Sequence, residues 1–305
     1  MTTTSSNSPA SHGHGLLEDI ERIDHLRLGR RRALAWLGSV GGGALLAGCG
    51  GGGSPSSSSS GSGSGTVTPT PTPSSSATPT PSPGSTAACT VPASETNGPY
   101  PGDGTNSSAG ITSNALTSLG VVRSDIRSSF VGSSTTVATG VETRLTLTLV
   151  DANNGCTPLQ GYAVYIWQCD KDGAYSLYNL PTESYLRGVQ VTDANGQVTF
   201  TTVFPGCYSG RWPHIHFEVF SSQTNATSGR YAVLISQFAM PQAQCAEVYA
   251  TSAYQASVSA YNRVSLASDG IFADNTAAQM AVMTLTMAGS VTDGYTATST
   301  IGIAT

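Results

Sequence analysis

Alternation of apolar and polar residues dominates the second half of the chain and predicts β-strands. The segment VETRLTLTLV at 141–150 places Leu145, Leu147 and Leu149 on one face, because successive side chains of a strand point to opposite faces. Four further segments with apolar alternation are predicted as strands: 161–169, 214–220, 230–238 and 277–287.

Two alternating runs within 188–203 are joined around Asn195-Gly196. An Asn-Gly pair between two such runs is the strongest short signal for a β-hairpin. Only the segment 243–258 has a helical pattern. Several short strands separated by turn signals therefore predict an all-β fold, a single β-sandwich domain with few short helices.

The N-terminal segment is typical of an export signal. Residues 30–32 are consecutive arginines, and the following run at 33–47 is uncharged and moderately apolar. The run is shorter than the about 20 residues that a membrane-spanning helix needs, and it ends in small residues as signal peptides do. The arginines resemble a twin-arginine signal, and LAGC at 46–49 resembles a bacterial lipobox, which would lipidate Cys49. An ordinary signal peptide and a chance LAGC match are the alternatives.

A linker is predicted after this leader. Residues 50–88 contain only Gly, Ser, Thr, Pro, Ala and Val, a composition that cannot bury a core and forms a flexible or extended tether. The predicted organisation is a signal peptide at 1–48, a linker at 49–88 and a folded domain at 89–305. The protein would thus be exported and anchored to a membrane through one lipidated residue.

The folded domain contains an odd number of cysteines. Disulfides persist outside the cytoplasm, but with five cysteines at least one thiol is left without an intramolecular partner. The five are Cys89, Cys156, Cys169, Cys207 and Cys245.

The charge of the chain indicates a small-molecule partner. The net charge is −5, and Lys171 is the only lysine. There is therefore no basic cluster of the kind that binds nucleic acid.

Two histidines indicate a metal site. Of the five histidines, the folded domain keeps only His214 and His216, which flank Ile215. Residues two apart in a strand share a face, with their bases about 6–7 Å apart, so both imidazoles can bind one metal ion. The alternative is two polar residues on a solvated strand face. From the histidines alone, zinc is the first metal to consider, although copper, nickel and iron also bind imidazole.

Two tyrosines change the expected metal. Tyr208 precedes His214 by six residues, and Tyr175 follows the strand predicted at 161–169. Taken singly, each is more commonly a packing residue. Together with the histidines they suggest two phenolates and two imidazoles. A free phenol has a pKa of about 10, so its ionisation near neutrality favours a hard trivalent cation such as ferric iron over zinc.

Three longer motifs carry a family resemblance. The segments WQCDKDGAY, RGVQVTDANGQVTFTTVFPGCYSGRWPHIHFEV and VLISQF resemble the intradiol ring-cleavage dioxygenases, which are non-haem iron(III) enzymes related to catechol and protocatechuate dioxygenases. The likeness covers most of 89–238, including ETNGPYP and RSDI. It implies that Fe(3+) is bound by four residues: Tyr175, Tyr208, His214 and His216.

The resemblance also implies roles for neighbouring residues. Arg211 matches the arginine that stabilises a carbanionic, ring-bound substrate, and Gln237 matches a glutamine beside it. Tyr100 matches a residue that lines the substrate pocket. Trp167 is the first residue of the first motif, and the sequence leaves open whether its role is structural or functional.

Two departures from the family pattern stand out. Cys207 occupies a position where exported relatives often carry a bulky residue, so it would be a reactive thiol or pair with Cys169. The helical dimerisation segment of the intracellular catechol enzymes is missing, which disfavours that subfamily.

The activity implied by the resemblance is intradiol ring cleavage. The substrate would be a small aromatic ortho-diol, O2 the co-substrate, a muconate-type diacid the product, and no organic cofactor is expected. Two alternatives come from other classes. One is a non-catalytic β-sandwich lipoprotein of the cell envelope that binds a metal or an aromatic ligand without consuming O2. The other is a purely structural lipoprotein that binds no iron.

Overall fold

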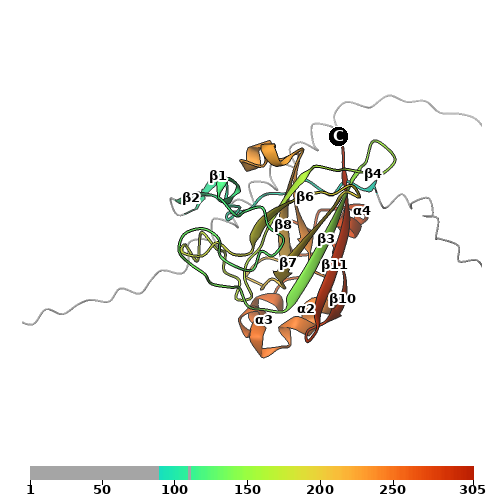
Figure 1. Ribbon diagram of the computed structural model, residues 1–305. Coiled ribbons are helices and arrows are strands. Elements are labelled where there is room, and N and C mark those ends of the chain that lie inside the picture. Colours follow the sequence, from blue (N-terminus) through green and yellow to red (C-terminus); the bar gives the residue numbers. More distant parts are fainter. Residues whose placement is uncertain (1–88, 109–110) are drawn as a thin grey trace, which may run out of the picture. The chain divides into compact units, whose positions relative to one another are not determined.

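The computed structural model describes residues 89–108 and 111–305 of the chain. The signal peptide predicted at 1–48 and the linker predicted at 49–88 lie outside the described residues, which begin at Cys89. Strands dominate the described part (Figure 1). The strands are β1 (Asp103–Ser108), β2 (Ile111–Asn114), β3 (Glu142–Asp151), β4 (Thr157–Pro158), β5 (Ala163–Trp167), β6 (Arg187–Val191), β7 (Gln197–Val203), β8 (His214–Phe220), β9 (Leu234–Ala239), β10 (Thr286–Ser290) and β11 (Gly294–Ile303). The helices are α2 (Gln242–Tyr249), α3 (Gln255–Tyr261) and α4 (Ala277–Met283).

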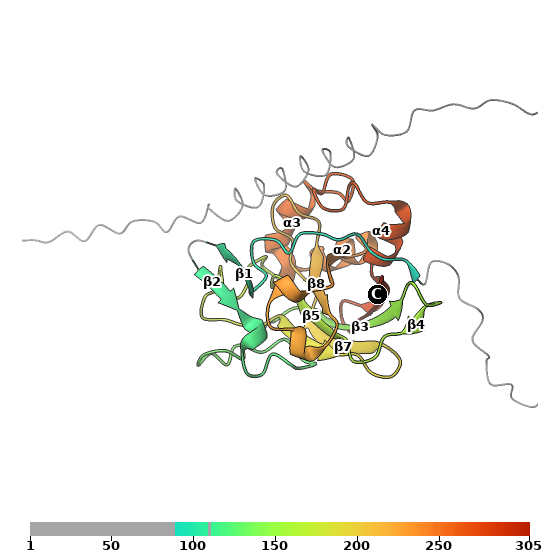
Figure 2. The ribbon, with the colours of Figure 1, turned by 90° about the horizontal axis from the view of Figure 1, so that it is seen from above.

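Two sheets pack face to face as a β-sandwich, as the alternation predicts (Figure 2). One sheet is antiparallel and has the order β6-β5-β8-β9. The other runs β10-β11-β3, with β7 and β4 both pairing with β3, and β11 runs parallel to β3. One apolar core joins the two sheets, and it includes Leu147 of β3, Phe200 of β7, Ile166 of β5 and Phe217 of β8.

The two faces of β8 have different surroundings. The residues Leu145, Leu147 and Leu149 of β3 are fully buried, as predicted, and Ile215 of β8 packs into the same core. All seven residues of β8 are nevertheless buried. The second face of this sheet is therefore covered too, and His216 lies on that covered face rather than on a solvated one.

The predicted hairpin at 188–203 is wrong in its strand pairing. The turn itself forms, since the Asp193 N–H donates to the Gln197 carbonyl at 3.0 Å. However, β6 pairs with β5, while β7 pairs with β3 in the other sheet. The Asn-Gly pair fixes the local turn, but each flanking run has its own apolar face to bury, and these faces lie in different layers of the sandwich.

The strand predicted at 277–287 is also wrong in part, because the segment begins as helix α4 and only its end joins β10. Thr276 and Gln279 form a capping box, in which each side chain bonds the other residue's backbone N–H. Such a box stabilises a helix start and outweighs the alternation. The helical pattern at 243–258 is confirmed as α2 and the start of α3, separated by a short 3-10 turn at 252–254.

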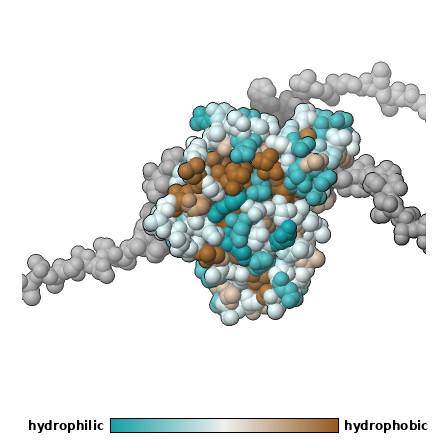
Figure 3. Space-filling model, in the orientation of Figure 1, coloured by the Kyte–Doolittle hydropathy of each residue, from teal (hydrophilic) through white to brown (hydrophobic). Residues whose placement is uncertain are grey.

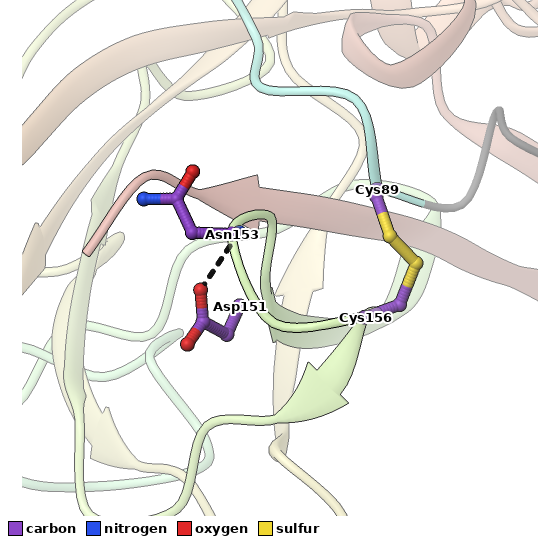
Figure 4. Close-up of a disulfide and its surroundings, with 4 residues drawn as sticks. All are labelled: Cys89, Asp151, Asn153 and Cys156. Carbon is purple, nitrogen blue, oxygen red and sulfur yellow. Dashed lines mark hydrogen bonds between the residues drawn. A yellow bond between two sulfur atoms is a disulfide. The ribbon is translucent and has the colours of Figure 1, made fainter.

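One disulfide closes the start of the domain. Cys89 is bonded to Cys156, which lies in the turn after β3 (Figure 4). In the same turn the Asn153 N–H donates to Asp151 at 2.9 Å. The bridge spans 67 residues of sequence, and a loop of that length corresponds to about 4 kcal/mol of stabilisation in the chain-entropy account.

A few large apolar side chains of the described part are exposed. On the face seen in Figure 3, apolar areas are separated by polar residues. The most exposed large apolar side chain is that of Leu119, and isolated exposure of this kind is ordinary. Within the described ranges no helix combines the length and apolarity required to cross a bilayer.

Candidate metal centre

Four side chains predicted as metal ligands converge on one point. The Tyr208 Oη lies 3.1 Å from the His214 Nε2, which in turn lies 3.1 Å from the His216 Nε2. The Tyr175 Oη lies 3.3 Å from His216 Nε2, 3.4 Å from His214 Nε2 and 3.5 Å from Tyr208 Oη. The structure therefore brings all four together.

The two histidines reach this point because of their register on β8. They occupy alternate positions of a strand paired on both sides, with β5 and β9. Their ring centroids are 4.7 Å apart and their planes are 77° apart. Both histidines are 2% exposed, so a metal ion bound by their Nε2 atoms would be shielded from bulk water by the histidines and their neighbours.

The two tyrosines come from loops that Gly206 allows to approach each other. Tyr175 lies in the loop after β5, and Tyr208 in the loop between β7 and β8. A Cβ at Gly206 would lie 2.6 Å from the Asp170 carbonyl oxygen and 2.7 Å from that of Lys171. Only glycine permits this close contact between the loop that carries Tyr175 and the loop that carries Tyr208.

Hydrogen bonding fixes which nitrogen of His214 can bind a metal. The His214 Nδ1 lies 2.5 Å from the Trp212 carbonyl oxygen. A carbonyl only accepts hydrogen bonds, so Nδ1 carries the proton and Nε2 keeps its lone pair. That lone pair points at Tyr208 and His216, which is the orientation that a metal ligand requires.

His216 is held by stacking instead. Its ring stacks on Trp167 with a centroid distance of 4.7 Å and an interplanar angle of 9°, and Trp167 stacks in turn on Tyr165. The His216 Nδ1 is buried without a hydrogen-bond partner in the described part of the chain. Trp167, which the sequence left between structural and functional roles, therefore fixes the plane of a candidate ligand.

The electrostatics keep both imidazoles neutral. Burial, together with the positive charge of Arg211, lowers the pKa of His214 to about 3. Burial and the neighbouring His214 lower the pKa of His216 well below its ordinary value. Burial and the proximity of Tyr208 raise the pKa of Tyr175 far above its ordinary value. A cation between these groups would have to displace the phenol proton.

The donor set and its spacing fit one small, hard cation. An ion about 2.1 Å from four tetrahedral donors would separate them by about 3.4 Å, and five of the six separations between these donors are 3.1–3.5 Å. The described residues contain no group of three or more His, Cys, Asp or Glu side chains placed to hold a metal. This site differs from such groups because two of its four donors are phenols.

Arg211 lies beside the four-residue cluster in a network of buried polar groups. Its Nη2 donates to Gln237 Oε1 at 2.6 Å, and its Nε donates to Asp269 Oδ2 at 3.0 Å. Gln237 pairs with His216 across β8 and β9 and donates to the Thr96 carbonyl at 2.9 Å. The arginine and the glutamine therefore lie together, as predicted.

Asp269 is a site residue that the sequence did not reveal. It is fully buried and also accepts the Trp212 N–H at 2.6 Å. Burial alone would raise the pKa of the Asp269 carboxyl, but the charge of Arg211 and the backbone N–H donors lower it below its usual value. A buried carboxylate thus fixes the guanidinium. No motif marks this residue, which lies 58 positions beyond Arg211.

Tyr100 lies next to the cluster but outside it. Its half-buried ring is 5.1 Å from that of Tyr175 and 5.1 Å from that of Tyr178. This placement agrees with a pocket wall. Tyr178 adds a second aromatic ring that the sequence reading missed.

The two readings of Cys207 can now be compared with its surroundings. Cys207 and Cys169 are both buried free thiols, so the alternative of a disulfide between them is not realised. Burial and the charge of Asp269 raise the pKa of Cys207 to about 12. A protonated, buried thiol is a poor nucleophile, which argues against a reactive role.

The comparisons with known proteins agree with this site. Residues 131–230 match the model of a family described as Dioxygenase, and this range contains Arg211 and the four converging residues. An intradiol ring-cleavage dioxygenase from Tetranychus urticae aligns with a TM-score of 0.53 and 28% identity, over 71% of this chain and 95% of that chain. A second dioxygenase crystal structure aligns with a TM-score of 0.53 and 26% identity, over the same shares. A search of curated proteins gave no match. The resemblance indicated by the sequence motifs is therefore confirmed.

Proposed function

We propose that this chain, an intradiol-type dioxygenase, cleaves a small aromatic ortho-diol between its two hydroxyl-bearing carbons, with O2 as co-substrate and a muconate-type diacid as product. The observation that carries the proposal is the convergence of two phenol oxygens and two imidazole nitrogens, with five of their six separations at 3.1–3.5 Å. The family match and the similar structures support the reaction class.

Ferric iron is the cation that best suits this donor set. Tyr175, Tyr208, His214 and His216 would hold it. Two neutral imidazoles leave the whole charge of the ion to be balanced by oxygen donors, and ionising two phenols, of which Tyr175 is fully buried, requires a strongly acidic cation. When bound, the iron supplies Lewis acidity and draws electron density from the ring diol, which prepares a ring carbon for reaction with O2.

The residues around the iron handle protons and charge. The half-buried Tyr208 is the more exposed of the two phenols, so it is the one that a substrate hydroxyl would reach, and its Oη would take up one of the two hydroxyl protons. The described domain holds no histidine beyond the two in the cluster, so this phenolate oxygen serves as the base. The guanidinium of Arg211 faces the negative charge that develops on the ring, and its fixed position makes that stabilisation effective.

Oxygen consumption with product identification tests the proposal. Purified protein loaded with iron should consume one O2 per substrate with at least one catechol of a panel of plain, alkylated, hydroxylated and carboxylated catechols. The product should be a diacid, since both carbons flanking the broken bond carry oxygen. An aldehyde-bearing product would instead mean cleavage beside the diol. Tight catechol binding without O2 uptake would mean a binding protein.

We also propose that the domain is exported and held at a membrane through a lipidated Cys49. The leader and linker residues lie outside the described part, so the support is the motifs at 30–32 and 46–49 together with the Cys89–Cys156 disulfide, a bond typical of oxidising compartments. In the native host, Cys49→Ser should move the protein from the membrane to the soluble fraction, while Cys156→Ser, the matched control, should not. Equal membrane association of both variants would contradict the lipid anchor.

A further inference from the structure

One fully buried arginine plays no part in the proposed chemistry. Arg187 is the first residue of β6 and is 0% exposed. Among the ion pairs of the described residues, none involves Arg187. Burying a guanidinium without a carboxylate is costly unless its N–H groups are satisfied by hydrogen bonds. What it bonds to therefore indicates what it does.

The guanidinium bonds two loops at once. Its Nε donates to Ser176 Oγ at 2.9 Å and its Nη2 to the Ser176 carbonyl at 2.8 Å. The same Nη2 donates to the Tyr100 carbonyl at 2.9 Å, and Nη1 donates to the Pro101 carbonyl at 2.8 Å. A longer contact of 3.3 Å joins Nη1 to Tyr165 Oη.

Each of the two loops carries a residue that lies at the metal centre or next to it. Ser176 directly follows Tyr175, and the ring of Tyr100 lies 5.1 Å from the ring of Tyr175. Arg187 therefore ties the backbone next to a candidate ligand to the backbone of a candidate pocket wall, and fixes both to a strand of the sheet.

The backbone around the guanidinium is adapted to it. Gly102 has a φ of 62°, and a Cβ at this position would lie 2.9 Å from Arg187 Nη1. Leu177, in the Tyr175 loop, adopts a φ of 67°. A leucine in the left-handed region costs free energy and persists only where its surroundings hold it. The bonds from Arg187 to Ser176, one residue earlier, provide such a hold.

We propose that Arg187 is a positioning residue that holds Tyr175 and Tyr100 in place against the histidine pair on β8. The effect on metal binding rests on the proposed function, in which Tyr175 is a ligand. The effect on the two loops does not, because these hydrogen bonds join Arg187 to Ser176 and to the Tyr100 and Pro101 carbonyls, and none involves a side chain of the four-residue cluster.

Hydrogen–deuterium exchange of the metal-free, full-length protein tests the clamp itself. Arg187→Met should raise exchange about tenfold or more at 98–102 and 175–180, since several hydrogen bonds are lost together. Arg187→Lys should behave similarly, because an ammonium cannot reproduce the planar fork. Leu147→Ala, a core change in the other sheet, should loosen the domain generally without selecting these loops. Exchange like that of the unsubstituted protein in Arg187→Met, or full rescue by lysine, would overturn the proposal.

Ser176→Ala keeps the test decisive if the Arg187 variants fail to fold. This change removes one hydroxyl that accepts from Arg187 and donates to the Tyr185 carbonyl at 2.7 Å. It should raise exchange at 175–180 to a smaller degree, and unchanged exchange there would contradict the clamp.

Iron binding supplies the second readout. With ferric iron added, the Arg187 variants should bind it about 10–100-fold more weakly and show a shifted phenolate-to-iron absorption band, whereas Leu147→Ala should keep the band of the unsubstituted protein. An unshifted band with unchanged affinity in Arg187→Met would overturn the link to Tyr175. If the unsubstituted protein binds no iron at all, the proposed function fails, and the exchange experiment still decides the role of Arg187.

Discussion

Replacing Arg211 by alanine is expected to lower kcat by about two to three orders of magnitude while leaving the iron bound. The guanidinium is not one of the four converging groups, so its removal leaves the metal ligands in place. It is a fixed, buried donor, bonded to Gln237 at 2.6 Å and to Asp269 at 3.0 Å. Losing one preorganised donor to a developing negative charge typically costs a factor of about 10²–10³. Steady-state oxygen uptake measures the loss of kcat, and the iron content of the same preparation shows whether the metal is still bound.

The alanine variant also leaves a buried carboxylate without its partner. Asp269 would keep its backbone donors but lose the arginine, which destabilises the fold. The double variant Arg211→Ala/Asp269→Asn separates this effect, since it should recover stability without recovering turnover. Arg144→Ala, which removes an exposed positive charge on β3, controls for net charge and should turn over normally. Turnover close to normal in Arg211→Ala would remove the role assigned to this residue.

Replacing His216 by leucine is expected to abolish both the iron site and turnover. The His216 Nε2 lies 3.1 Å from His214 Nε2 and 3.3 Å from Tyr175 Oη, so the substitution removes one of the four proposed metal-binding atoms. Changing a group that merely supports a ligand costs about 10–100-fold in metal affinity, and losing the ligand itself should cost more than about 100-fold. Iron titration followed by visible absorption measures this directly.

A destabilised control distinguishes ligand loss from general damage. Leu147→Ala removes a fully buried side chain from β3, and such changes typically cost about 2–5 kcal/mol. It should melt at a lower temperature and still bind iron with unchanged affinity. Iron binding by His216→Leu equal to that of the unsubstituted protein would show that the ion is held elsewhere.

Local patterns in the sequence were sufficient to predict the β-sandwich fold and the placement of the two histidines on one strand face. Alternation placed Leu147 in the core and put His214 and His216 on one face, because strand periodicity determines which side chains share a face. The two tyrosines lie on loops, where no periodicity operates, so they were suggested by their nearness in sequence to the histidines and to a predicted strand, and the longer family motifs then gave them a role. The distances between the four groups required the structure.

The features that could not be predicted from the sequence depend on contacts between segments that are distant along the chain. The Asn-Gly turn was predicted correctly, but the layers that β6 and β7 join depend on which face of each strand finds an apolar partner. Strand β11 pairs with β3 along nine residue pairs, although more than 140 residues separate the two in sequence. Asp269 and Arg187 gain their roles in the same way, from partners that no local motif specifies.

The most direct test of the account is an anomalous-scattering map of crystals of the iron-loaded protein, recorded at the iron absorption edge. A single anomalous peak enclosed by Tyr175 Oη, Tyr208 Oη, His214 Nε2 and His216 Nε2 is the predicted result. A fully loaded protein whose peak lies at any other place would contradict the assignment of these four side chains as the ligands.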